Sequence, residues 1–355
     1  MKKVIVFFGV IAFAVLAVVS CKQKGSDKQK ESEADTTPLF VVSQNGKKGY
    51  IDVEGQLVIQ PQFDNAWDFS EGLARVRKRD GQGEGYINKK GKMVIKAQFD
   101  WGGRFSEGLA PVSKEFGGKW GYINKRGKYT IEPQFDSAKS FSGGLAVVRI
   151  GDKYGYVDVT GETIIEPQFD LAEDFFEGLA TVQIDGKWGY IDNTGEIIIE
   201  PQFVGGGVSR FSEGLTNVVK KFGEKWWYID KTGKQAITPR FDAALPFSEG
   251  LAAVRVGRKW GYIDKSGNVV IKMQFDTAGS FSDGLAVVRI ARKWAYIDKT
   301  GEIVVKPQID HLRTDAGDFS QGLARMVEKT FGAKGTIEKW GYIDETGDYV
   351  WEPTR

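Results

Sequence analysis

The sequence predicts an all-β fold, a tandem array of about nine three-stranded antiparallel units arranged as an open β-solenoid-like structure. Three observations lead to this prediction. A tyrosine motif recurs at intervals of 34 to 46 residues, a phenylalanine-containing connector recurs between its copies, and apolar residues alternate with period two between the two motifs. Repeats of this length are typical of arrays in which each unit buries its apolar face against its neighbours.

The N-terminus has the pattern of a secretion signal. Lys2 and Lys3 precede an apolar run at residues 4–19, which Ser20 ends. The run has 16 residues, fewer than the roughly 20 that a membrane-spanning helix needs, so a permanent transmembrane helix is the weaker alternative. We therefore expect residues 1–20 to be a signal peptide that is removed.

A lipid anchor is expected at Cys21. The segment Val18-Val19-Ser20-Cys21 resembles the lipobox of bacterial lipoproteins, and this resemblance implies cleavage before Cys21 and lipidation of that residue. A secreted protein with an unmodified cysteine is the alternative. Residues 22–37 contain no aromatic or large aliphatic side chain, so we expect residues 21–37 to be a disordered tether that precedes a β domain at 38–355.

Three motifs recur in the same order within residues 38–355. The tyrosine, in a Gly-Tyr-Ile-Asp-like context, stands at Tyr50, Tyr86, Tyr122, Tyr156, Tyr190, Tyr228, Tyr262, Tyr296 and Tyr342. The connector, of the type Phe-Ser-Glu-Gly-Leu-Ala, begins at Phe69, Phe105, Phe141, Phe175, Phe211, Phe247, Phe281 and Phe319. A Pro-Gln-Phe-Asp motif ends at Asp64, Asp100, Asp136, Asp170, Asp242, Asp276 and Asp310, with Val204 in place of the aspartate once. Eight connectors therefore join nine units.

The tyrosine motif resembles a known repeat. The segment Lys187-Trp188-Gly189-Tyr190-Ile191-Asp192-Asn193-Thr194-Gly195 and its copies are similar to the WG, or KWG, repeats of bacterial proteins, and the similarity covers nearly the whole chain after the tether. Trp-Gly itself stands at Trp120, Trp188, Trp260 and Trp340, while Lys48, Gly85 and Tyr154 take the tryptophan position and Trp227 and Ala295 take the glycine position in other units. Members of this family are generally described as repeat proteins without an established activity, so the resemblance implies architecture more than function.

The residues predict the strands of a unit in order. Period-two alternation predicts one strand at residues 145–150, and the following unit has a second at 188–192, with the tryptophan and tyrosine on one face. The turn at 192–195 begins with aspartate and ends with glycine, which is typical of a short hairpin. A β-branched run at 197–199 predicts the third strand, which we expect Pro201 to end.

Two shapes allow such units to bury their aromatic residues, an open array and a closed β-propeller. The pattern predicts whole units at both ends, Leu39 to Ile59 and Leu323 to Trp351. No blade shared between the chain ends is therefore available to hold a ring closed, and this favours the open array over the propeller.

Little of the chemistry that catalysis requires is present. His311 and Cys21 are the only histidine and cysteine, which leaves no histidine-based metal cluster and no Cys-His pair. Aspartate and glutamate recur at turn positions, whereas a glycosidase needs one pair at a defined separation, so we interpret them as turn formers. Calcium binding by the turn aspartates is the alternative, although Asn88 and Asn124 replace two of them. We expect no enzyme activity, no cofactor and no metal.

The net charge of +2 does not indicate nucleic-acid binding. Lysines recur just before the tryptophan position, and we interpret them as a solvated strand edge that resists aggregation, with a basic binding stripe as the alternative. They are Lys119, Lys187, Lys225, Lys259, Lys293 and Lys339.

Departures from the repeat are the best pointers to a binding surface, because the shared residues are needed for folding. They fall at two connector tryptophans and in the segments 77–84, 205–207, 311–318 and 329–338. The candidate binding residues are Trp67, Trp101, His311, Arg313, Lys329, Phe331 and Lys334. Neutral variation of loops is the alternative.

These features predict a cell-envelope protein that contacts the membrane through lipid on Cys21 and binds another envelope protein through its repeat surface. A carbohydrate or peptidoglycan binder that uses Trp67 and Trp101 is one alternative, and an enzyme of unknown class is another. Lys22 does not resemble the aspartate that retains lipoproteins in the inner membrane, so the outer membrane or cell surface is favoured over the inner membrane.

Overall fold

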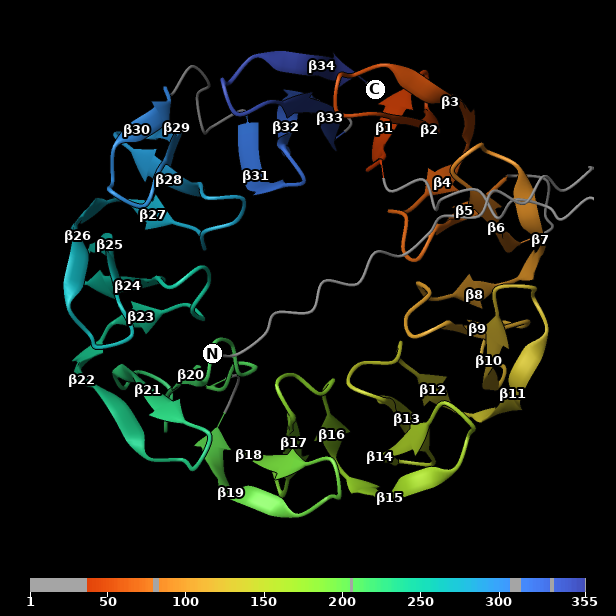
Figure 1. The fold of residues 1–355 in the computed structure, drawn as a ribbon, viewed down its shortest axis with the longest axis horizontal. Helices are drawn as coiled ribbons and strands as arrows, with labels where there is room; N and C mark the ends of the chain where they lie inside the picture. Colours follow the sequence, from red (N-terminus) through yellow and green to blue (C-terminus); the bar gives the residue numbers. More distant parts are fainter. Residues whose placement is uncertain (1–36, 79–82, 205–206, 307–313, 333–334, 355) are drawn as a thin grey trace, which may run out of the picture. The chain divides into compact units, whose positions relative to one another are not determined.

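The computed structural model describes residues 37–78, 83–204, 207–306, 314–332 and 335–354. Its strands form nine small antiparallel sheets, the blades of a propeller, which follow one another around a ring in chain order (Figure 1). The predicted signal peptide, Cys21 and all but the last residue of the tether lie outside the described residues. Within the described part there is no helix with the length and hydrophobicity needed to cross a bilayer.

The strands are assigned to the blades as follows. Blades 1 to 3 contain β1 (Phe40–Gln44), β2 (Lys47–Ile51) and β3 (Leu57–Phe63); β4 (Asn65–Ala66), β5 (Leu73–Arg77), β6 (Glu84–Asn88) and β7 (Met93–Phe99); β8 (Trp101–Gly102), β9 (Leu109–Ser113), β10 (Trp120–Asn124) and β11 (Tyr129–Phe135). Blades 4 to 6 contain β12 (Ser137–Ala138), β13 (Leu145–Ile150), β14 (Lys153–Asp158) and β15 (Thr163–Phe169); β16 (Leu171–Ala172), β17 (Leu179–Ile184), β18 (Lys187–Asp192) and β19 (Ile197–Val204); β20 (Leu215–Val218), β21 (Trp226–Asp230) and β22 (Gln235–Phe241). Blades 7 to 9 contain β23 (Ala243–Ala244), β24 (Ala252–Val256), β25 (Lys259–Ile263) and β26 (Val269–Phe275); β27 (Thr277–Ala278), β28 (Ala286–Ile290), β29 (Lys293–Ile297) and β30 (Ile303–Val305); β31 (Thr314–Ser320), β32 (Leu323–Gly332), β33 (Gly335–Ile343) and β34 (Tyr349–Thr354).

Blade 5 shows the common pattern of an inner, a second, a third and an outer strand, here β16, β17, β18 and β19. The three long strands confirm the predicted three-stranded unit, and the connector adds the short inner strand. The expectation that Pro201 ends the last strand is wrong, because β19 continues to Val204. A proline is tolerated there because the outer strand is an edge, where its missing N–H leaves no partner unpaired.

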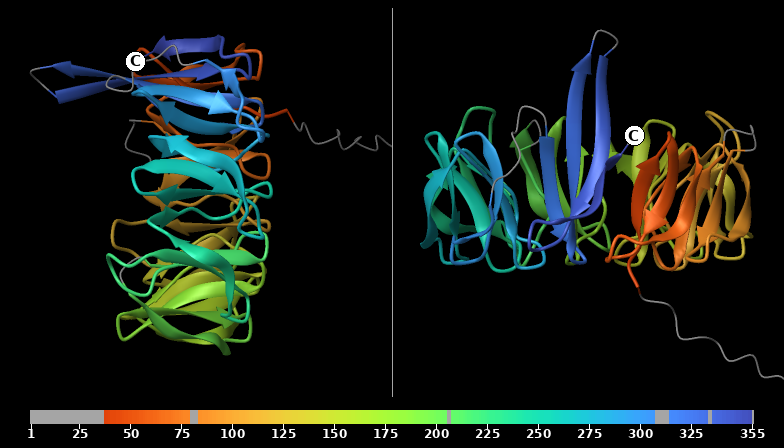
Figure 2. Two further views of the ribbon diagram at one scale, coloured as in Figure 1. Left: turned by 90° about the vertical axis from the view of Figure 1, so that its left-hand side faces the viewer. Right: turned by 90° about the horizontal axis from the view of Figure 1, so that it is seen from above.

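The turns divide between the two faces of the ring. Because neighbouring strands are antiparallel, the inner turn, which joins the inner to the second strand, and the outer turn, which joins the third to the outer strand, lie at one face. We call it the inner-turn face, and β1 begins there. The middle turns, between second and third strands, form the opposite middle-turn face, from which β32 and β33 project beyond the other blades (Figure 2).

A buried tyrosine in the third strand of each blade binds the next blade. In all nine blades its hydroxyl donates a hydrogen bond of 2.6–2.9 Å to a backbone carbonyl of the following blade. In blade 4, for example, the Tyr156 hydroxyl donates to the Glu173 carbonyl at 2.9 Å, and the Tyr156 and Phe175 ring centroids are 4.9 Å apart. The recurring tyrosines and phenylalanines are therefore the interface between blades.

The ring closes between blade 9 and blade 1. The Tyr342 hydroxyl donates to the Val41 carbonyl at 2.9 Å, the Tyr342 and Phe40 ring centroids are 5.5 Å apart, and Tyr342 shares a buried cluster with Val42 and Leu323. The structure is therefore the closed propeller, the alternative to the open array that the sequence favoured. As predicted, no blade is shared between the two ends of the described chain, so side-chain packing and hydrogen bonds close the ring there in place of strand pairing.

Tyr342→Phe is expected to weaken this closure by about 1–2 kcal/mol, because it removes the hydroxyl and leaves the Val41 carbonyl unpaired. Tyr156→Phe removes the equivalent bond within the ring and is the matched control. Hydrogen exchange should become faster in β1 and β33 for the first variant, and only in blades 4 and 5 for the second. Unchanged exchange at the seam in Tyr342→Phe would show that this bond does not hold the ring closed.

Candidate binding surface on blades 2 and 3

A buried glutamate replaces the repeat tryptophan in blade 2. Glu84 pairs with Phe99 across β6 and β7, as Trp120 pairs with Phe135 in blade 3. The sequence assignment of Gly85 to the tryptophan position is therefore wrong by one residue. Glu84 is only 2% exposed, so its carboxylate needs partners inside the protein.

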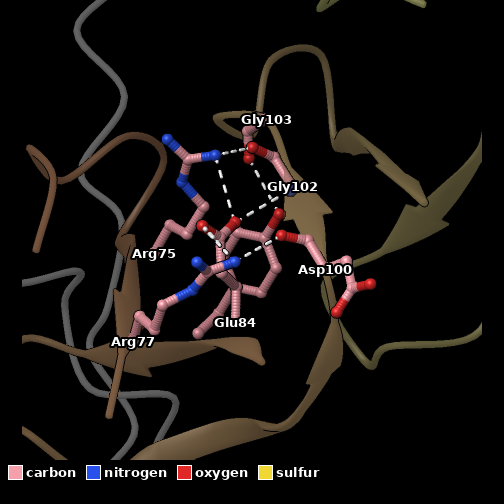
Figure 3. Close-up of polar contacts among 7 residues, drawn as sticks. Arg75, Arg77, Glu84, Asp100, Gly102 and Gly103 are labelled. Atoms are coloured by element: carbon pink, nitrogen blue, oxygen red, sulfur yellow. Dashed lines mark hydrogen bonds and ion pairs between the residues drawn. The ribbon is translucent and has the colours of Figure 1, made fainter. Parts of the chain in front are cut away.

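Two arginines and a backbone amide supply those partners (Figure 3). Arg75 and Arg77 form ion pairs with the Glu84 carboxylate at 3.2 and 3.4 Å, and the Gly102 N–H donates to it at 2.9 Å. Arg75 also donates to the Gly102 carbonyl, and Arg77 donates to the Asp100 carbonyl at 2.5 Å. The cluster therefore joins blade 2 to the inner strand of blade 3.

The electrostatics of Glu84 reflect two opposed effects. Burial raises the pKa of the Glu84 carboxyl above its usual value, while the charges of Arg75 and Arg77 act to lower it. The arginines are themselves only partly exposed. The three groups therefore depend on one another to remain charged away from water.

The first connector tryptophan, Trp67, belongs to this cluster. The Arg75 guanidinium lies 3.6 Å from the centre of the Trp67 ring, in a cation–π contact. Trp67, Arg75, Asp68 and Arg104 line a cavity of about 240 Å³. Trp67 therefore serves packing and lines a small cavity, and it does not form an exposed aromatic platform.

The second, Trp101, does form an exposed platform. It is 45% exposed, and its ring centroid lies 6.5 Å from that of Phe116, which is 84% exposed at the tip of the middle turn of blade 3. The Phe116 N–H donates to the Asp100 carboxylate at 2.9 Å, and Gly117 has a φ of +73° that completes the turn. This turn holds a large apolar side chain out in solvent.

Blade 6 repeats this turn. Phe222 is 97% exposed at the tip of its middle turn and is followed by Gly223 with a φ of +84°. Blade 9 has the same dipeptide, Phe331-Gly332, at the end of β32. Blades 3 and 6 therefore carry Phe-Gly at the middle turn, and blade 9 carries it at the end of the strand that leads to this turn. Sequence reasoning missed the pattern because it appears only when the repeats are compared in groups of three.

The remaining predicted residues are less informative. Lys329 forms an ion pair with Asp315 beside the long hairpin. Phe331 lies in β32, but its side chain is outside the described part, as are His311, Arg313 and Lys334 entirely. The structure thus places Trp67 on blade 2 and Trp101 on the neighbouring blade 3, and it places Lys329 on blade 9.

The recurrent charged residues are structural. In the outer turns an aspartate carboxylate accepts two backbone N–H groups, as Asp192 does from Thr194 at 2.9 Å and Glu196 at 3.0 Å, in agreement with the turn interpretation. Of the six lysines before the tryptophan position, Lys119, Lys225 and Lys259 form ion pairs with the aspartates that directly follow the outer strands. Among the described residues, no group of three or more potential ligands is placed to hold a metal ion.

Comparison with known proteins agrees with this architecture. The family model of the WG containing repeat matches residues 49–81, 85–120, 120–154, 154–188, 188–226, 228–260, 260–294 and 294–329. Most of these matches run from the third strand of one blade to the second strand of the next, which is why eight matches span nine blades. A search of curated proteins gave no match.

One solved structure shows the same fold. A eukaryotic initiation factor is similar with a TM-score of 0.65 at 11% identity, over 90% of this chain and 96% of that one. Hsv2p of Kluyveromyces lactis has a TM-score of 0.40 at 10% identity, over 67% and 95%, and virginiamycin B lyase of Staphylococcus aureus has 0.34 at 14%, over 87% and 96%. The first likeness shows the fold alone, and the other two are too slight to support an argument.

Glu84→Ala is expected to lower the free energy of unfolding by about 3 kcal/mol, because it leaves Arg75 and Arg77 partly buried without a counter-charge. The control is the double variant Arg75→Val, Glu84→Trp, which installs the pair that blade 8 has at these positions, Val287 and Trp294. Calorimetry should show a lower melting temperature for Glu84→Ala than for the double variant. If the two variants melt together, the ion cluster does not hold blades 2 and 3 together.

Proposed function

This chain belongs to the family of WG containing repeat proteins, and from that premise we propose that it is a lipid-anchored scaffold of the cell envelope that binds another protein through its middle-turn face. The observation that carries the proposal is the pair of exposed phenylalanines. Phe116 and Phe222 are 84% and 97% exposed at equivalent turn tips. Single exposed apolar residues are common, whereas the same residue presented at the same position in two blades indicates a contact surface.

The position of the N-terminus supports this use of the middle-turn face. Strand β1 begins at the inner-turn face, opposite to the middle turns that carry the phenylalanine tips and opposite to the β32–β33 hairpin (Figure 2). With lipid on Cys21, as the lipobox resemblance implies, the tether would join the face that points away from the tips. The middle-turn face would then remain accessible to a partner in the envelope.

Binding without catalysis is part of the proposal. The acids that recur in the chain are engaged as turn and ion-pair partners, as Asp192 and Asp136 illustrate, which supports a structural use of these groups. Phe116 and Phe222 instead form apolar tips. A contact surface needs shape and apolar area, both of which the middle turns offer.

A glycan or peptidoglycan ligand is the second candidate. The observation that favours it is the exposed pair Trp101 and Phe116, whose adjacent rings offer an amphipathic surface on which a sugar can lie. Blade 6 has the phenylalanine but no tryptophan at the corresponding place. A sugar would therefore depend on Trp101, and a protein partner on both phenylalanines.

Cross-linking and affinity capture from native membranes test the main proposal. The unaltered protein and a control with exposed outer-strand valines changed, Val270→Ser and Val304→Ser, are expected to capture the same envelope protein. Phe116→Ser with Phe222→Ser should lose it, because both apolar tips are removed. Equal capture by all three would sink the proposal, and capture of peptidoglycan alone, lost in Trp101→Ala, would establish the second candidate.

The lipid anchor has a separate test. Cys21→Ser is expected to abolish incorporation of a radiolabelled fatty acid and to release the protein from membranes, since the thiol is the proposed attachment point. A conservative change in the tether, Ser26→Thr, is the control and should leave labelling unchanged. Labelling that persists in Cys21→Ser would refute the anchor.

A further inference from the structure

Blade 1 lacks an inner strand in the described part of the chain. Seven blades have one, and in blade 6 a bridge between Val208 and Val218 takes its place. The blade 1 sheet begins with β1, so no described strand lies along the edge of β1 that faces the centre of the ring (Figure 1). An open strand edge is a template for a further strand.

Pro38 prevents the inner turn, which in the other blades joins the inner strand to the second strand. In the other eight blades two successive inner-turn residues have positive φ, and the second is a glycine at 78–88°. Thr37 and Pro38 occupy the corresponding places in blade 1. A shared contact identifies them: Lys89 Nζ donates to the Thr37 carbonyl at 2.5 Å, just as Lys231 Nζ donates at 2.7 Å to the carbonyl of Glu177, the first of the two turn residues in blade 5. The proline ring holds φ near about −65°, so Pro38 cannot form this turn.

Blade 1 compensates for only the apolar part of the missing strand. Phe40 stands where blade 2 has Ala74, and its ring packs on Tyr342, where other blades use the phenylalanine of the inner turn. The Tyr342 hydroxyl bonds the Val41 carbonyl because no inner-strand carbonyl is present. The inner backbone edge of β1 and the polar groups around it are not covered by a described strand. A peptide that binds there therefore needs backbone hydrogen-bonding groups and a charged side chain more than an aromatic ring.

The open edge borders a cavity of about 540 Å³ between the inner turns of blades 9 and 2. Two groups that line it are the Ser320 hydroxyl and the Gly72 N–H. Their counterparts in blade 3 bind neighbouring inner turns, Ser106 to the Phe141 carbonyl at 2.7 Å and the Gly108 N–H to a glutamate carboxylate at 3.0 Å. No described residue fills these roles for Ser320 and Gly72, so the cavity offers a donor at each end.

The charge at this site is negative. Asp68, Glu71 and Asp318 line the cavity together with Lys89 and Arg325, three carboxylates against two cations. Burial and the nearby Asp68 carboxylate raise the pKa of Tyr342 to about 12, while the charge of Arg325 acts to lower it. At the junction of blades 4 and 5, Lys139 follows the inner strand of blade 4 and forms an ion pair with Glu173. Its charge also acts on the adjacent Asp174, the equivalent of Asp68, and opposes the rise in the pKa of Asp174 that burial causes. No ion pair joins Asp68 to a described residue. The junction of blades 4 and 5 thus indicates what the missing strand would carry, a basic side chain.

We propose that the inner edge of β1 is the docking site for an extended basic segment of a partner protein, which adds the missing strand and places a lysine or arginine against Asp68. The Val41 carbonyl would accept from its backbone, as the Arg75 carbonyl accepts from the Trp67 N–H at 3.1 Å in blade 2. The site lies at the inner-turn face, away from the phenylalanine tips. It is therefore independent of the function proposed above.

The probe is a labelled peptide that copies residues 137–142 of blade 4 with Phe141→Ala, so that it keeps Lys139 as its charged side chain and leaves the aromatic place to Phe40; it is added to the full chain. Fluorescence anisotropy should show binding, and hydrogen exchange should slow in β1. Asp68→Lys is expected to weaken binding at least about tenfold, because it places like charges together. A peptide with Lys139→Glu should bind this variant better than it binds the unaltered protein.

Two control variants distinguish this site from the rest of the surface. Asp152→Lys, at an exposed middle turn of blade 4, and the Phe116→Ser, Phe222→Ser variant should both keep the affinity for the peptide. Absence of binding, or binding that Asp68→Lys does not weaken, would overturn the proposal. Binding by the compact unit Thr36–Arg355 but not by the full chain would also overturn it, and would assign the site to the protein's own N-terminal segment.

Discussion

The hydrogen bond from one tyrosine hydroxyl to the backbone of the next blade is the interaction on which the propeller depends. A sheet of three or four short strands has little stability alone, so each blade needs its neighbours. Tyrosine meets this need in two ways, because its ring packs on an aromatic residue of the next blade while its hydroxyl finds a buried acceptor. Tyr342 makes the same two contacts across the seam, with Phe40 and Val41, and so one device builds the ring and closes it.

The repeated motifs were enough to predict the units but not their arrangement. Period-two alternation located β13 at Leu145–Ile150, because a strand buried on one face imposes this pattern. The rotation between blades depends instead on close approaches such as that of Gly195 to Ile165, where an added Cβ would lie 3.1 Å from the isoleucine. Spacing along the chain carries no information about such contacts. Inner strands of two residues, such as β16, are likewise too short to alternate.

The candidate surface was predictable only in part, because departures from a repeat have different physical causes. Trp67 and Trp101 both stood out, yet one is stacked under Arg75 and the other is exposed. Glu84 was hidden by a one-residue error in the tryptophan position and is an internal ion-pair partner. Phe116 looked like an ordinary turn residue until its place in the ring matched that of Phe222.

A ring that is closed without a shared blade is expected to open first at its seam when it is placed under mechanical load. Every blade is covalently joined to both of its neighbours except at the seam between blades 9 and 1. Force transmitted from a membrane through the N-terminal segment would reach Pro38 and then β1, which is held by its pairing to β2 and by the side-chain contacts of Tyr342 and Phe40. Because Tyr342 and Val41 form a single hydrogen bond where a shared blade would have a ladder, blade 1 would peel away before the remaining blades are strained. With lipid on Cys21, as proposed, the seam would thus act as a mechanical release next to the blade that the anchored segment enters first.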